Sequence, residues 1–123
     1  MKIALDTGGG LVVTGTGAGW IRVGTAEVRG NVVLTHDAVV PGWAPHGFDA
    51  LEASDFAALL DYTPEIVLLG TGATQRFAHP RLLAPLHAAR IGVETMATPA
   101  ACRTFNILSG EGRRVVAALI VTA

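Results

Sequence analysis

The sequence has 123 residues, of which half are hydrophobic and 15% are charged; this fits one folded domain with a substantial core and excludes a disordered chain. A net charge of −1 with scattered basic residues argues against nucleic-acid binding, and a single cysteine excludes an internal disulfide and a multi-cysteine zinc site. No apolar run approaches the roughly 18 residues that cross a bilayer, and the segment 1–6 meets an aspartate too early for a signal peptide. We therefore expect a cytoplasmic protein without membrane insertion, most simply a bacterial one.

The first part of the domain, residues 1–50, is typical of short β-strands separated by glycine turns. The expected strands are rich in β-branched and aromatic side chains and cover 12–14, 20–23, 26–28 and 32–35. The expected turns fall at Gly15, Gly17, Gly19, Gly24 and Gly30. A loop over 41–47 follows, because two prolines and two glycines suit neither a helix nor a strand ladder. This part predicts a β-hairpin or meander layer.

From residue 51 to 123 helical periods alternate with short apolar blocks. Ser54 is expected to cap a first helix, which ends at Thr63-Pro64 and buries an i, i+3, i+4 stripe of Phe56, Leu59 and Leu60. The block 65–70 shows no alternation and therefore predicts a strand covered on both faces.

A second helix is expected within 80–90 and a further buried strand over 91–95. Pro85 falls inside this helix, where it removes an amide hydrogen and crowds the preceding turn. We therefore expect the helix to start late, near Leu82, or to be kinked.

A third helix is expected to begin with Thr98 as its cap and Pro99 in its first position, where a missing amide hydrogen costs nothing. Gly110 suits the left-handed residue that ends such a helix. A last strand covers 115–121. This alternation of strands and helices predicts an α/β fold with βαβ crossovers and a mainly parallel sheet flanked by helices.

A strand leads directly into the G-x-G turn of Gly70 and Gly72. In dinucleotide-binding folds such glycines let the backbone approach a pyrophosphate at a helix N-terminus. Here Gln75 occupies the third glycine position, and Pro80 delays the following helix. The pattern therefore favours a tight turn at the end of a strand over a nucleotide site.

Cys102 is the single thiol and stands beside Arg103 in the expected first turn of the third helix. A helix N-terminus and a nearby cation both favour a thiolate, which makes this the place for a reactive cysteine. Apolar neighbours favour instead a packed, unreactive thiol, because burial disfavours the charged form.

The histidines predict no metal site. His36, Asp37, His46 and Asp49 gather only loosely around the loop 41–47, and nothing in the sequence supplies a rigid pair of ligands. We expect no cofactor, and we find no Gly-x-Ser-x-Gly nucleophile motif.

Four runs in the second part resemble a family of small α/β domains: 67–72, 92–96, 100–108 and 111–115. The family has no established biochemical activity, and it includes a mitochondrial assembly factor for respiratory complex I and an adipogenesis-associated protein. The resemblance implies a three-layer α/β fold around a mixed sheet with extra N-terminal β structure. It supplies no catalytic residues.

We expect a non-catalytic protein-binding or assembly module with a protein partner, in one domain over 1–123. An absence of catalytic motifs and the role of the family's assembly factor favour this hypothesis over an enzyme. Trp43, Arg113 and Arg114 are the candidate contacts, since aromatic side chains and arginines are frequent at interface centres. Loop packing of the tryptophan and solvation of the arginines are the alternatives, and the sequence does not determine the oligomeric state.

The alternative function is a site for a small anion or nucleotide, or a thiol-dependent enzyme, at one edge of the sheet. Ends of strands and starts of helices converge there in a βαβ unit, where two capping groups and a guanidinium would suit a carboxylate or phosphate. The candidate residues are Gly70, Thr71, Gly72, Thr98, Cys102 and Arg103.

Overall fold

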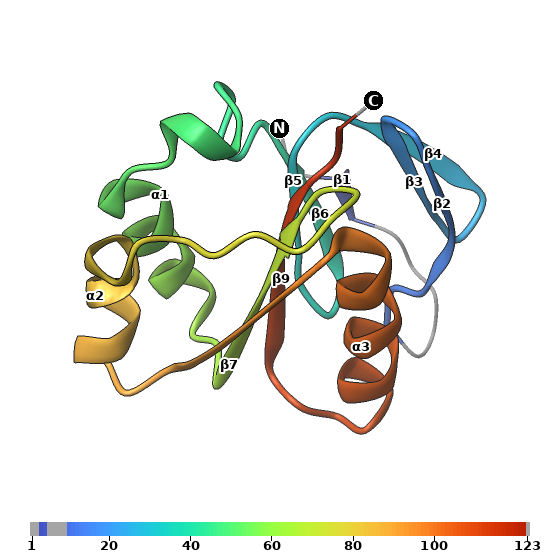
Figure 1. The fold of residues 1–123 in the computed structure, drawn as a ribbon. Helices are drawn as coiled ribbons and strands as arrows, with labels where there is room; N and C mark the ends of the chain where they lie inside the picture. The colour runs from blue at the N-terminus through green and yellow to red at the C-terminus, as the bar shows by residue number, and fades with distance from the viewer. Residues whose placement is uncertain (1–2, 5–9, 123) are drawn as a thin grey trace.

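The computed structural model describes residues 3–4 and 10–122, which form two β-sheets with helices packed around them (Figure 1). The strands are β1 (Ile3–Ala4), β2 (Val13–Gly17), β3 (Trp20–Val23), β4 (Ala26–Arg29), β5 (Val32–Leu34), β6 (Ala38–Pro41), β7 (Ile66–Thr71), β8 (Gly92–Met96) and β9 (Val115–Ile120). The helices are η1 (Phe48–Ala50), α1 (Ala53–Ala57), η2 (Ala58–Tyr62), α2 (Pro80–Ala88) and α3 (Thr98–Gly110), where η denotes a 3-10 helix. Most of the segment 1–6, from which we expect no signal peptide, lies outside the described residues.

The larger sheet has the strand order β1-β6-β5-β9-β7-β8 among the described residues. β7 pairs in parallel with β8 and β9, as the predicted crossovers require, whereas β5 pairs antiparallel with β9 and β6. The sheet is therefore mixed, and its parallel part is smaller than predicted, being confined to the strands after residue 65. β2, β3 and β4 form a separate antiparallel sheet, which confirms the predicted N-terminal hairpin layer.

The larger sheet is the middle of three layers (Figure 1). α1, η2 and α2 cover one face, and α3 together with the small sheet covers the other. Because successive strand side chains point to opposite faces, β9 contributes to both cores. Alternate residues from Val115 to Leu119 meet α3 and the small sheet, and those from Val116 to Ile120 meet α1 and α2. Burial on both faces explains the unbroken apolar sequence of β9.

The first half of the chain contains more strand than the sequence predicts. β2 runs to Gly17, so Gly15 and Gly17 lie inside a strand, and the β2–β3 turn falls at Ala18-Gly19. Gly17 in β2 lets the indole of Trp20 pack against the strand; a Cβ there would lie 2.4 Å from the ring and displace it. β6 was not predicted, because it is short and ends at a proline, which usually marks a strand end or a loop.

α1 begins two residues earlier than a Ser54 cap would allow. The residue before the helix is Glu52, whose amide donates to Asp55 Oδ2 at 2.8 Å, so Ser54 lies within the first turn. The predicted stop is confirmed, because Thr63 takes the left-handed conformation that ends η2. Phe56 is fully buried in the core under these helices.

α2 begins at Pro80, which contradicts the predicted late start near Leu82. Pro80 is the first helical residue, where it needs no amide hydrogen, and the side chain of His79 accepts a hydrogen bond from Arg81 N at 3.0 Å. Pro85 is accommodated inside the helix. The strand that follows, β8, is an edge strand and only half buried, so the prediction of a buried strand is wrong there.

α3 differs from its predicted ends by single residues. Thr98 is the first helical residue instead of the cap, and Gly110 is still helical. The positive φ of 81° belongs to Gly112, two residues further on.

Within the described part of the chain, no helix has both the length and the apolar character that crossing a membrane requires.

Candidate functional site

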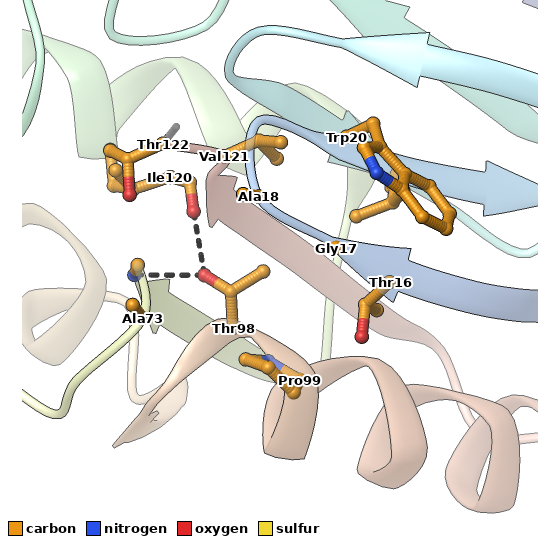
Figure 2. A pocket seen from close by; sticks show the side chains of 12 residues that line it. Thr16, Gly17, Ala18, Trp20, Ala73, Thr98, Pro99, Ile120, Val121 and Thr122 are labelled. Carbon is orange, nitrogen blue, oxygen red and sulfur yellow. Dashed lines mark hydrogen bonds between the residues drawn. The ribbon is translucent and has the colours of Figure 1, made fainter.

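A cavity of about 410 Å³ opens between the tip of the β2–β3 hairpin, the loop after β7, the first turn of α3 and the end of β9 (Figure 2). We call it the hairpin cavity. Among the described residues its walls are mostly apolar, with hydroxyl groups but no charged side chain: Thr16, Gly17, Ala18, Trp20, Ile21, Gly72, Ala73, Thr98, Pro99, Ile120, Val121 and Thr122. Gly19 N donates to the Thr122 carbonyl at 2.6 Å and so fastens the hairpin tip to the chain after β9.

Thr98 fills the G-x-G turn that the sequence marks as a candidate site. Its hydroxyl accepts from Gly72 N at 2.8 Å and donates to the Ile120 carbonyl at 2.6 Å (Figure 2), and its amide donates to the Gly72 carbonyl at 2.8 Å. Gly70 allows this approach, because a Cβ there would lie 2.9 Å from Thr98 Oγ1. At the start of α3 the first amide is therefore occupied, and the second residue is Pro99, which has none. The turn leaves little for a phosphate to bind.

Thr71 is buried and organises the loop that follows β7. Its hydroxyl donates to the Thr74 carbonyl at 2.8 Å and accepts from Arg76 N at 2.9 Å. The guanidinium of Arg76 lies over the Phe48 ring, 4.1 Å from its centre, and pairs with Asp49. The structure thus brings together four predicted site residues at the end of β7: Thr98 bonds Gly72 and packs against Gly70, while Thr71 bonds the loop that follows.

The other two candidates of this group, Cys102 and Arg103, line a second hollow of about 190 Å³. It lies between residues 13–16 and the first turns of α3, and we call it the β2–α3 hollow. It shares Thr16 and Pro99 with the hairpin cavity. Of the six candidates, Gly72 and Thr98 therefore line one hollow, Cys102 and Arg103 line the other, and Gly70 and Thr71 line neither.

The thiol of Cys102 is packed in the core, with 2% of the residue exposed. Burial raises its pKa to about 11, against the opposing effect of the positive charge of Arg103. At neutral pH the thiol is therefore protonated and a poor nucleophile. The structure favours the packed-thiol alternative over thiol chemistry.

Trp43, a candidate partner contact, lies in the second core, with 8% of the residue exposed. Its indole N–H donates to the Asp55 carbonyl at 2.9 Å, and its ring meets Phe56 edge-on at 5.8 Å. The loop 41–47 therefore holds this side chain as packing, which was the alternative reading of the residue.

Arg113 and Arg114, the other candidate contacts, are exposed at the turn before β9. Arg113 Nε lies 3.5 Å from Glu65 Oε1, and Arg114 Nε donates to the Thr63 carbonyl at 3.1 Å. The backbone amide of Arg114, more than the two guanidinium charges, holds the pKa of Glu65 below its ordinary value. Both side chains thus help to join β9 to the end of η2, and their role as partner contacts stays a prediction.

The histidines and acidic residues of the first half do not converge. His36 Nδ1 lies 3.0 Å from Ser109 Oγ, at the end of α3, whereas Asp49 pairs with Arg76. Within residues 3–4 and 10–122, no three His, Cys, Asp or Glu side chains lie close enough together to hold a metal ion.

Two asparagines that sequence reasoning passed over join distant segments. Asn106 donates to the Val13 carbonyl and accepts from Val13 N, both at 2.8 Å, and so closes one end of the β2–α3 hollow. Asn31 donates to the Ala44 carbonyl at 2.7 Å and accepts from Val121 N at 2.8 Å. A poor helix former such as Asn106 between apolar helix residues is the signal that could have revealed the first contact.

Residues 13–120 match the family described as "Protein of unknown function (DUF498/DUF598)". An uncharacterised protein of Rhodobacter capsulatus is 38% identical over 114 residues, which cover 91% of this chain and 86% of that protein. The zebrafish "NADH dehydrogenase [ubiquinone] 1 alpha subcomplex assembly factor 3" is 38% identical over 100 residues and 76% of this chain. The matched part covers 58% of that factor, so the chain spans a little over half of its length.

The fold has solved relatives as well. A crystal structure from Bordetella parapertussis superposes with a TM-score of 0.81 at 37% identity, covering 91% of this chain and 96% of that one. Sequence and fold therefore agree, and both agree with the resemblance carried by the runs 67–72 and 100–108. The chain belongs to the DUF498/DUF598 family, which includes the complex I assembly factors.

Proposed function

We propose that this chain is a non-catalytic protein-binding or assembly module, and that its hairpin cavity receives an apolar side chain of the partner. The observation that carries the proposal is the cavity itself, about 410 Å³ in volume and mostly apolar where the described residues line it. This volume is in the range of ordinary ligand pockets, and buried pockets that take an apolar anchor are where interfaces gain most of their affinity.

The polar groups of the cavity favour an apolar occupant. The Thr98 hydroxyl already donates to the Ile120 carbonyl and accepts from Gly72 N. It therefore needs no hydrogen bond from the occupant, and an apolar side chain would leave both bonds intact. Thr16, Ala18 and Ala73 are exposed at its lining and can be covered by a partner. The names of the assembly-factor relatives support a partner that is a protein.

The anion-binding and thiol-dependent alternatives have less support from the geometry. Thr98 occupies the amide of Gly72, and burial keeps the Cys102 thiol protonated. A thermal-shift screen with nucleotides, phosphate and organic acids tests the anion-binding alternative, and labelling of the native Cys102 thiol near pH 7 tests the thiol-dependent one. Stabilisation by one of these ligands would favour the alternative function, since a ligand at 100 times its Kd should stabilise the fold by about 2.7 kcal/mol.

A site-specific crosslink tests the protein-binding proposal. A photo-reactive amino acid replaces either Ala73 or Ala88, and each variant is expressed in the organism from which the gene comes. Ala73 is an exposed residue of the cavity, whereas Ala88 is an exposed residue of α2 on the opposite side of the sheet. We expect the Ala73 probe to capture a protein that the Ala88 probe does not.

A matched pair of variants then tests whether the cavity holds the partner. Ala73→Trp fills the cavity mouth, whereas Ala88→Trp makes the same change far from it. Loss of the complex only in Ala73→Trp supports the proposal, and equal capture at both positions contradicts it.

A cytoplasmic location belongs to the same proposal, and recovery of the chain with membranes after cell fractionation would contradict that part.

A further inference from the structure

We propose that the partner segment is extended and carries an acidic residue two positions from its apolar anchor, which Arg103 recognises. The inference rests on the proposed function and adds the chemistry of the partner. The hairpin cavity and the β2–α3 hollow are adjoining, since Thr16 and Pro99 line both. A segment anchored in the first can therefore continue into the second.

Charge complementarity selects the acidic residue. Arg103 is exposed and is the one charged side chain among the described residues that line either hollow. Its guanidinium makes no hydrogen bond or ion pair within the described part of the chain. It can therefore pair with a carboxylate of the partner without breaking an existing contact.

The spacing follows from two backbone repeats. Pro99, at the boundary of the two hollows, and Arg103 are one helical turn apart, which is about 6 Å along the axis of α3. An extended segment advances about 3.3 Å per residue and points alternate side chains to the same face. Its residues i and i+2 are therefore about 6.6 Å apart on one face, which is close to the rise of about 6 Å from Pro99 to Arg103 along α3.

Asn106 limits the segment at the end of the β2–α3 hollow. Asn106 already bonds both the amide and the carbonyl of Val13, each at 2.8 Å, and so blocks strand pairing at that end of β2. Asn106 lies about one turn beyond Arg103 along α3, so the proposed segment is short.

Peptide display against the folded chain tests the inference. A library of random nine-residue peptides is selected on the wild-type protein, on Arg103→Glu and on Arg103→Gln, with Arg81→Glu as a control that makes the same charge change on an exposed arginine of α2. We expect wild type and Arg81→Glu to enrich Asp or Glu two positions from a large apolar residue, and Arg103→Glu to enrich Lys or Arg there. A selected acidic peptide should bind Arg103→Gln roughly two- to fivefold more weakly, as for a partly exposed ion pair.

The outcomes separate the two proposals. Peptides with an apolar anchor and no charge preference, or the same charge preference with Arg103→Glu, overturn this inference and leave the proposed function standing. If the wild type selects no apolar anchor, or if Ala73→Trp selects the same peptides as wild type, the cavity is not the binding site and both proposals fall.

Discussion

The hydroxyl of Thr98 joins three segments that are distant in sequence. It bonds the loop after β7 through Gly72 N and the end of β9 through the Ile120 carbonyl, while its own backbone begins α3. Thr98 is buried, with 5% of the residue exposed, so water replaces neither bond readily. The shape of the hairpin cavity at this wall therefore depends on one oxygen atom.

Replacing Thr98 by Val keeps the volume of the side chain and removes that oxygen. We expect a loss of about 1–3 kcal/mol of unfolding free energy, because the Gly72 amide and the Ile120 carbonyl lose their partner. Thr98→Ser keeps the hydroxyl and should retain more of the stability. Urea unfolding of both variants measures the difference; a Thr98→Val variant as stable as wild type beside a destabilised Thr98→Ser variant would show that the methyl group, not the hydroxyl, matters.

Cys102 makes stability depend on pH in the alkaline range. Burial raises the pKa of the thiol from 9.0 to about 11, so between these values the unfolded chain loses a proton that the folded chain keeps. Stability is then fully present below pH 9 and falls as the pH rises toward 11. We expect Cys102→Ala, although less stable at neutral pH, to lose less stability over this interval. Parallel pH dependence of the two proteins, or fast labelling of the native thiol near pH 7, would contradict the buried thiol.

At the scale of the elements, α3 lies close to β7 only because position 70 has no side chain. A Cβ on Gly70 would lie 2.8 Å from Leu119 Cδ2 and 3.2 Å from Thr98 Cα, and the backbone atom cannot move aside cheaply. A Cβ on Gly92, in the neighbouring β8, would instead meet no other atom within 4 Å. The two glycines offer a test of helix packing within one sheet.

Gly70→Ala should therefore lower the unfolding free energy by about 1–3 kcal/mol through overpacking, whereas Gly92→Ala should leave it nearly unchanged. Thermal and urea unfolding of both variants provide the comparison. If Gly70→Ala were as stable as Gly92→Ala, α3 would tolerate a wider separation from the sheet than the contacts indicate.

Elements with a strong local pattern were predicted well. β9 is apolar throughout and β7 is apolar from Ile66 to Leu69, and α3 combines Pro99 near its start with a long regular period, so each pattern predicts its element without tertiary information. β8 was misjudged because its exposure depends on its place at the sheet edge, and strand order is not a local property. β6 depends on pairing with β1 and β5, which no short window of sequence reveals.

The candidate site was predicted in its position more than in its chemistry. The sequence correctly placed Gly70, Gly72 and Thr98 at one sheet edge, because strand ends and helix starts meet there in βαβ units. That the Thr98 hydroxyl fills the turn depends on side-chain geometry across 26 residues. The hairpin wall of the cavity comes from residues 16–21, whose contact with β9 is a long-range packing effect.

The whole molecule consists of two cores that share one sheet. One core joins α3 and the small sheet to the larger sheet, and the other joins α1, η2 and α2 to its opposite face. β7 and β9 send alternate side chains into both cores. If these strands separate, the apolar side chains of both cores therefore become exposed. The two layers of helices should therefore unfold together.

The two tryptophans allow this cooperativity to be measured, since each reports on a different part of the molecule. Trp20 lies on β3 in the small sheet, and Trp43 lies in the core beneath α1. We prepare Trp20→Phe, in which fluorescence follows Trp43, and Trp43→Phe, in which it follows Trp20. In each variant we expect the urea midpoint from fluorescence to coincide with the midpoint from far-UV circular dichroism, as two-state unfolding requires. Comparison within a variant removes any effect of the substitution on stability. An earlier fluorescence midpoint in Trp43→Phe alone would mean that the small sheet, and the hairpin cavity with it, opens before the rest of the molecule.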